Sequence, residues 1–306
     1  MLNRRELLAG AGAALTLGAL PFAWTAAQQP QPRKKKKLLM YTRSEGFQHS
    51  VVARQGNKLS LAENLVTELG KKHGFEAVCE KDGRIFLSRE FPSFDGFVFM
   101  TQGNLLAEKC KDGSPPMTLD GKKALLKAIE DGKGFVGCHC ASDTFHSPDH
   151  YRGGQFKNQQ GKDIDPYIQM LGGEFIRHGR QQKAWMRVTD SNFPAARGLK
   201  DFNLHEEWYS LKNFAPDLHV ILIQDTKGMV DFDYERPPFP ATWARMHGKG
   251  PVFYTSMGHR EDVWQHEIFQ KLLVGAIHWA VGNIEFKPTA NIDKVTPQAR
   301  TLPMKK

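Results

Sequence analysis

The first half of the chain alternates short apolar runs with amphipathic segments, and this order constrains the fold more than any other feature. Four apolar runs have the length of buried strands: 38–42, 75–79, 95–100 and 134–138. Two segments carry apolar residues at helical spacing, and each ends beside a glycine: 58–73 and 120–131. Strands and helices in this order form a mostly parallel sheet with helices on both faces. The sequence therefore predicts an α/β fold.

The second half of the chain is rich in expected strands. Their ranges are 183–189, 206–211, 219–225, 240–247 and 251–257, and the last two flank Gly248-Lys249-Gly250, a hairpin signal. A closing helix is expected at 264–281, and the polar tail after it is expected to be loose. The pattern predicts one domain over 38–283, with an antiparallel extension of the sheet, followed by a loose tail at 284–306.

The first 27 residues have the order of an export signal. Arg4 and Arg5 precede an apolar stretch at 7–20, and small residues follow at 25–27. The arginine pair favours the twin-arginine route. The apolar stretch is shorter than the roughly 20 residues that a membrane span needs, so no stable span is expected after processing. We therefore expect a periplasmic or secreted protein.

The net charge of +9 comes mainly from the N-terminus. Residues 1–37, which include a basic leader at 28–37, hold seven of the 42 Lys and Arg and one of the 33 Asp and Glu. The remainder has 35 basic and 32 acidic residues, a charge of +3. A nucleic-acid binder would carry its basic residues on the folded domain, so nucleic acid is not an expected partner.

The four cysteines do not form a metal-binding or redox motif. Cys138 and Cys140 are not expected to bridge each other, and no CxxC pair is present for a thiolate zinc site. Export would allow a disulfide, but the sequence leaves open whether Cys79 and Cys110 form one.

The block from Gly134 to Phe145 gives the strongest sign of chemistry. A buried strand reaches a turn at Gly137, His139 lies at the carboxyl end of the strand, and Asp143 follows four residues later. Ligands of α/β sheets bind at these strand ends. The imidazole and the carboxylate could form an acid–base pair or share a metal. The alternative is a core histidine followed by a capping aspartate.

Four further segments place polar side chains at strand ends or on short extended pieces: 44–49, 172–178, 205–209 and 257–262. They contribute His49, His178, Glu207 and His259, each of which alone could be an ordinary surface or loop residue. If 205–209 is extended, Glu207 and Tyr209 share one face. We expect His49, His139 and His259 to converge at one edge of the sheet.

Together these motifs resemble the ThuA-like (trehalose utilisation) family, whose fold is related to class I glutamine amidotransferases and is flavodoxin-like. The similarity extends from about 37 to 283 and rests on 45–49, 134–145, 172–175 with His178, 206–209, 242–243, 248–254 and 258–259. That amidotransferase fold usually carries a nucleophilic cysteine between two glycines. Here the turn reads Gly137-Cys138-His139-Cys140-Ala141 and lacks the second glycine. ThuA-like proteins generally lack the nucleophile, so Cys140 is the weakest candidate for catalysis.

The resemblance implies carbohydrate chemistry, with a sugar dehydrogenase as a partner in the same pathway. The first hypothesis is a lyase, isomerase or hydrolase that acts on a sugar or keto-sugar glycoside. Its expected catalytic residues are His139, Asp143, Glu207 and His259. Its expected substrate-binding residues are His49, His178, Tyr209 and Trp243. Zinc or a similar divalent metal would be held by His49, His139 and His259, and no nucleotide cofactor is expected.

The second hypothesis is a non-catalytic carbohydrate-binding protein. Aromatic side chains would then stack on sugar rings, and the candidates are Trp185, Trp208, Tyr209, Trp243 and Trp264. A standard glycosidase needs two acids, and a pocket with four candidate histidines fits that mechanism poorly.

Overall fold

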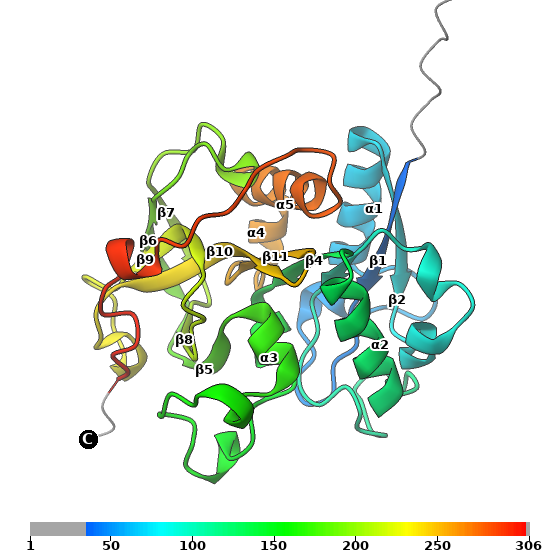
Figure 1. Ribbon diagram of the computed structural model, residues 1–306, viewed down its shortest axis with the longest axis horizontal. Helices are drawn as coiled ribbons and strands as arrows, with labels where there is room; N and C mark the ends of the chain where they lie inside the picture. The colour runs from blue at the N-terminus through cyan, green and yellow to red at the C-terminus, as the bar shows by residue number, and fades with distance from the viewer. Residues whose placement is uncertain (1–34, 304–306) are drawn as a thin grey trace, which may run out of the picture. The chain divides into compact units, whose positions relative to one another are not determined.

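The computed structural model describes residues 35–303 and shows the predicted α/β fold (Figure 1). A nine-stranded sheet has the order β2-β1-β3-β4-β11-β10-β9-β6-β7. Its strands are β1 (Lys36–Tyr41), β2 (Phe75–Glu80), β3 (Gly96–Phe99), β4 (Gly134–Cys138), β6 (Gln182–Val188), β7 (Phe202–Glu206), β9 (His219–Asp225), β10 (Phe239–His247) and β11 (Gly250–Thr255). The predicted signal peptide at 1–27 lies outside the described residues, as do residues 28–34 of the leader.

The direction of the strands divides the sheet into two parts. β2, β1, β3, β4 and β11 pair in parallel, whereas β10, β9, β6 and β7 add antiparallel pairs. This arrangement confirms the mostly parallel sheet with an antiparallel extension. A second sheet pairs β5 (Glu174–His178) with β8 (Tyr209–Lys212).

Helices cover both faces of the large sheet, as the sequence predicts (Figure 1). α1 (Leu61–His73) and α5 (Glu267–Ala280) pack on one face, and α2 (Leu119–Glu130) and α3 (Pro166–Leu171) pack on the other. The side chains of β1 show the alternation that this requires. Leu38 and Met40 join one hydrophobic core, while Leu39 and Tyr41 join the other, because successive side chains of a strand point to opposite faces.

Local capping decides where α1 begins and ends. Ser60 and Glu63 form a capping box, in which each side chain accepts a hydrogen bond from the backbone of the other residue. The helix therefore starts at Leu61, three residues after the predicted start. It ends at Gly74, whose φ of +84° is the left-handed conformation that glycine adopts easily.

The structure corrects several predicted boundaries. The expected strand at 206–211 is two strands of different sheets, β7 and β8, separated by Glu207 and Trp208. The expected helix at 264–281 is broken at His266 into α4 (Glu261–Gln265) and α5, because the His266 side chain caps the start of α5. α3 is not among the predicted elements, and β5 was expected only as a short extended piece that carries His178.

The prediction of a loose tail is wrong for residues 284–303. Asn291 exchanges two hydrogen bonds with Val220 of β9, through its side-chain oxygen and nitrogen. Ile292, at the start of α6 (Ile292–Val295), is buried, and the carbonyl of Ala299 accepts a hydrogen bond from Arg236. The few apolar residues of this polar segment cover the edge of the core beside β9.

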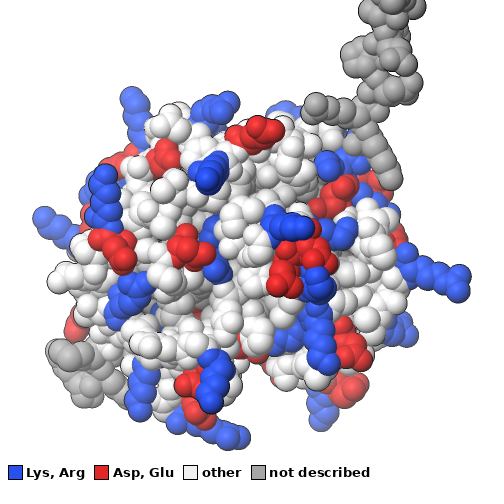
Figure 2. Space-filling view, viewed as in Figure 1, with Lys and Arg blue, Asp and Glu red and all other residues white. Residues whose placement is uncertain are grey.

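None of the helices within 35–303 is both long and apolar enough to cross a membrane. Lysine and arginine are interspersed with aspartate and glutamate on the face that Figure 2 shows. This mixture agrees with the near-neutral charge of the chain after residue 37.

Candidate functional site

Four side chains meet where the parallel strands end, and we call them the histidine–glutamate cluster: His49, His139, Glu207 and His259. One ligand atom from each lies within 4.8 Å of those of the other three. The ring centroid of His49 lies 5.0 Å from that of His139 and 5.0 Å from that of His259, and the centroids of His139 and His259 are 5.3 Å apart. These distances confirm that the three histidines converge.

The turn after β4 fixes the orientation of His139. Its φ of +42° is unusual for a residue with a side chain. Its Nδ1–H donates to the carbonyl of Ser256, 2.8 Å away, and its ring packs 3.9 Å from the ring of Tyr209. With Nδ1 engaged, Nε2 faces the cluster, 3.5 Å from Glu207 Oε2.

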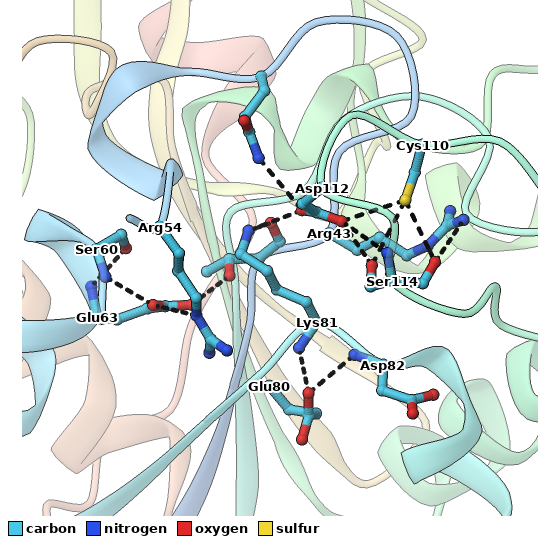
Figure 3. A network of polar contacts seen from close by, with 12 residues as sticks. Arg43, Arg54, Ser60, Glu63, Glu80, Lys81, Asp82, Cys110, Asp112 and Ser114 are labelled. Atoms are coloured by element: carbon cyan, nitrogen blue, oxygen red, sulfur yellow. Dashed lines mark hydrogen bonds and ion pairs between the residues drawn. The ribbon is translucent and has the colours of Figure 1, made fainter. Parts of the chain in front are cut away.

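The loop that carries His49 is anchored by a buried polar network at the ends of β1 and β2 (Figure 3). Lys81 Nζ donates to the carbonyl of Thr42 and to Asp112 Oδ2, which also accepts from Gln48 Nε2. His49 itself is buried. Burial, together with the neighbouring His139 and His259, lowers the pKa of His49 well below its ordinary value, so its ring is neutral at neutral pH.

A second buried acid positions His259 at the end of β11. Glu206 Oε2 accepts hydrogen bonds from the backbone N–H groups of Gly258, at 2.8 Å, and His259, at 3.1 Å. Gly258 has a φ of +124°, which a residue with a side chain rarely adopts. His259 Nδ1 thereby reaches 2.9 Å from Glu207 Oε2.

Glu207 is the acidic member of the cluster and is 8% exposed. Burial opposes its charge, but the contacts with His139 and His259 outweigh burial and hold its pKa well below the usual range. Its other oxygen, Oε1, lies 3.4 Å from Nδ1 of His178, whose side chain is 43% exposed. Glu207 is therefore an ionised carboxylate, and His178 lies at the rim of the cluster.

The cluster fits a divalent cation. Among the residues that the structure describes, His49 Nδ1 and His139 Nε2 are buried nitrogens without a hydrogen-bond partner, and His259 Nδ1 has only the Glu207 carboxylate beside it, 2.9 Å away. Buried polar atoms normally have partners. Imidazole nitrogens and a carboxylate are the usual ligands of zinc and similar metals. A ligating histidine also commonly donates its other N–H to a backbone carbonyl, as His139 does to Ser256.

Asp143 does not join this cluster, so the predicted His139–Asp143 pair is wrong. The turn from His139 to Asp143 is a short 3-10 helix. Asp143 Oδ1 accepts from His146 Nε2 at 2.6 Å, and its Oδ2 accepts from Gln102 Nε2 at 2.9 Å. The backbone curls between the two residues, and the carboxylate pairs with His146 instead.

The predicted aromatic contacts with substrate also need correction. Trp243 is fully buried, and its indole N–H donates to the carbonyl of Leu171, so it cannot contact a substrate. Trp208 and Trp264 are buried as well, while Trp185 is 43% exposed. Tyr209 is 2% exposed and packs on the ring of His139, which Glu207 also contacts.

All four cysteines are free thiols. Cys79 and Cys110 hydrogen bond to different partners, Glu63 and Asp112 respectively. Burial raises the pKa of Cys138 to about 12 and that of Cys140 well above its ordinary value. A buried thiol of this kind is a poor nucleophile.

Sequence reasoning missed a second group of titratable side chains, His146, His150 and Glu174, whose ligand atoms also lie within 4.8 Å of one another. The four-residue spacing of the two histidines was a weak signal. Glu174 lies in the Gly172–Phe175 motif, 24 residues after His150, and only the fold brings it to them.

Comparison with known proteins identifies the family. The family model described as ThuA, trehalose utilisation, matches residues 37–280. The chain belongs to the ThuA family. This membership agrees with the motifs in the sequence and with the observed fold.

Solved structures share this ThuA fold at low sequence identity. A ThuA-like protein from Bacteroides uniformis is 18% identical with a TM-score of 0.57, covering 83% of this chain and 94% of that one. A ThuA-like protein from Parabacteroides merdae is 17% identical with a TM-score of 0.56, covering 89% and 98%. A cytoplasmic protein from Salmonella typhimurium LT2 is 11% identical with a TM-score of 0.52, covering 80% and 99%. A search of curated proteins found no match.

Proposed function

We propose that this ThuA protein is an exported enzyme that acts on a sugar or keto-sugar glycoside by metal-assisted acid–base chemistry. One observation carries the proposal: three imidazole nitrogens, two of them without a hydrogen-bond partner, and an ionised carboxylate converge where the parallel strands end. Burying these groups together is costly unless a cation or a substrate satisfies them. The family's description, trehalose utilisation, supports a carbohydrate as the substrate.

Different residues would hold the cation and move the proton. His49, His139, His259 and Glu207 would hold the cation, which would polarise a carbonyl or hydroxyl oxygen of the sugar. Ser256 and Tyr209 fix the ring of His139, and Glu206 fixes the backbone of His259. This adds Glu207 to the expected ligands His49, His139 and His259, and His49 keeps its expected role as ligand rather than that of a substrate contact.

His178 is the candidate acid–base residue at the rim. Its side chain is 43% exposed, so it can reach a substrate and exchange protons with water. In an elimination on a keto-glycoside, the base removes the proton from the carbon beside the ketone. The glycosidic C–O bond then breaks as a C=C bond forms, and the leaving oxygen receives a proton. In an isomerisation, the same proton returns to a different atom.

The place of this enzyme in metabolism follows from the same chemistry. A keto-glycoside arises when a dehydrogenase oxidises a sugar hydroxyl, so a sugar dehydrogenase would supply the substrate. The expected twin-arginine signal would place this step in the periplasm or outside the cell.

A non-catalytic carbohydrate-binding protein is the second candidate. Phe47 favours it, because this side chain is 58% exposed and packs edge to face on His49, 4.9 Å between centroids. An exposed aromatic ring beside the cluster could stack on a sugar.

Metal analysis followed by assays separates the two candidates. The purified protein is analysed for bound metals and then incubated with glucosides and their 3-keto forms. We expect about one divalent metal per chain and metal-dependent turnover of a keto-glycoside. His139→Ala should abolish both, whereas Trp185→Ala, outside the cluster, should change neither. Sugar binding without turnover in the metal-loaded protein would favour the second candidate.

A further inference from the structure

A cavity of about 540 Å³ lies beside the second group of titratable side chains. His146 and His150 line it, together with residues from the loops after β1, β3 and β4. The volume falls in the range of small-molecule sites, about 300–1,000 Å³. The histidine–glutamate cluster does not use these residues.

The second group is a hydrogen-bonded ion cluster rather than another metal site. Glu174 is fully buried and accepts from both histidines, at 3.1 Å from His146 and 3.0 Å from His150. It also accepts from Ser147 and Asn213, each at 2.6 Å. A carboxylate has about four lone-pair positions, and these contacts fill them.

His146 carries a positive charge between two carboxylates. Its Nδ1–H donates to Glu174 and its Nε2–H donates to Asp143, so both nitrogens are protonated. Burial opposes this charge, but the contacts with Asp143 and Glu174 outweigh burial and raise the pKa of His146 to about 9. The ring therefore has no lone pair for a metal.

His150 differs from its neighbour in having a spare acceptor. Its Nδ1–H donates to Glu174, so its Nε2 has the lone pair, and within residues 35–303 that buried atom has no partner. His150 is 2% exposed and lines the cavity. Tyr151, which is 76% exposed, contacts both histidine rings edge to face, at 5.0 Å from His146 and 4.7 Å from His150. Tyr151 and the spare acceptor of His150 therefore lie beside each other at this cavity.

The cavity is lined by side chains of both charges. Glu45, Asp149 and Asp165 are the acids and Lys122 and Arg152 are the cations, while the charge of His146 is already paired with Asp143 and Glu174. Lys122 pairs with Asp165 at 2.6 Å, and its Nζ lies 4.0 Å from the ring centroid of Phe145. A wall with many hydrogen-bonding groups, charges of both signs and an exposed aromatic ring suits a neutral ligand with many hydroxyl groups.

The cavity and the histidine–glutamate cluster are built on shared elements. β5 places Glu174 at one end and His178 at the other, a separation of about 13 Å for a strand of this length. The loop that contributes Glu45 to the cavity continues to His49 four residues later. A ligand with two sugar units could therefore lie along this edge of the sheet.

We propose that this cavity binds the non-reacting sugar unit of a glycoside whose other unit lies at the histidine–glutamate cluster. The proposal rests on the proposed function and extends it, because it makes the substrate at least a disaccharide or a comparable polyhydroxylated glycoside. Tyr151 supplies an aromatic surface for the sugar ring, and His150 Nε2 accepts a hydrogen bond from a sugar hydroxyl group.

The test measures binding of trehalose, a neutral disaccharide, to metal-free protein by titration calorimetry and ligand-observed NMR. Tyr151→Ala and Arg152→Ala should each weaken binding at least about tenfold. Tyr151→Phe, which keeps the ring, should bind like the wild type. Trp185→Ala is the matched control, because it removes an exposed aromatic ring outside the cavity, and it should not change binding.

Each result decides the question. Absence of trehalose binding at about 50 mM, or binding that survives Tyr151→Ala, would overturn the proposal, as would an equal loss in Trp185→Ala. Binding that depends on Tyr151 in a protein that takes up no metal and turns over no glycoside would retain this site and contradict the proposed function. Metal uptake and turnover without such binding would retain the proposed function and contradict this site.

Discussion

Zinc should stabilise this protein by an amount that can be worked out from its size. A ligand that binds only the folded state at 100 times its Kd adds about 2.7 kcal/mol to the free energy of unfolding. The described domain spans 35–303. Because unfolding entropy is about 2.1 cal/mol/K per residue, about 0.6 kcal/mol corresponds to one degree. The melting temperature should therefore rise by about 5 °C.

Differential scanning fluorimetry of chelator-treated protein, with and without zinc, measures this shift. Glu207→Gln should remove most of it, because this change keeps the shape of the side chain but deletes the anionic ligand. His278→Ala is the matched control, since this histidine lies on α5 away from the cluster, and it should keep the full shift.

Glu174→Gln tests which of the two groups of side chains holds the metal. It should lower the melting temperature in every sample but leave the zinc-dependent rise unchanged, because hydrogen bonds already occupy the carboxylate oxygens of Glu174. The reasoning is refuted if no divalent cation shifts the melting temperature, if Glu207→Gln keeps the full shift, or if Glu174→Gln abolishes it.

Three further predictions follow from buried groups and from the N-terminus. The depressed pKa of Glu174 adds stability that is present above its unfolded pKa and is lost as the pH falls. The free energy of unfolding in urea, measured between pH 7 and 3, should therefore fall less steeply with pH in Glu174→Gln than in the wild type. Identical slopes would contradict this. Native Cys140 should resist iodoacetamide at pH 8, because burial raises its pKa and blocks access, and Cys140→Ala should keep most activity; rapid labelling of Cys140 detected by mass spectrometry would restore the thiol as a candidate nucleophile. Replacing Arg4 and Arg5 by lysine should stop export, as followed by cell fractionation, and unchanged export without dependence on the general secretion route would exclude the twin-arginine signal.

Local patterns in the sequence determined the fold class and most of the strands. The apolar runs that became β1, β3 and β4 are continuous because those strands are buried on both faces. The same patterns predicted that His49, His139 and His259 would converge, since each follows the carboxyl end of a strand, and parallel strand ends meet at one edge. β5 was expected only as a short extended piece, because it belongs to a small separate sheet in which its partner, β8, lies more than 30 residues away in the sequence.

Only the tertiary structure decided the partners of the polar side chains. Asp143 looked like the partner of His139 because the two are close in sequence, yet it pairs with His146, and both nitrogens of His146 are then taken by carboxylates. Trp243 was predicted to stack on a sugar ring, but its side chain is fully buried in the fold. Periodicity records which face of an element is apolar. It does not record which distant segment will supply a hydrogen bond, because that choice depends on how the whole chain packs.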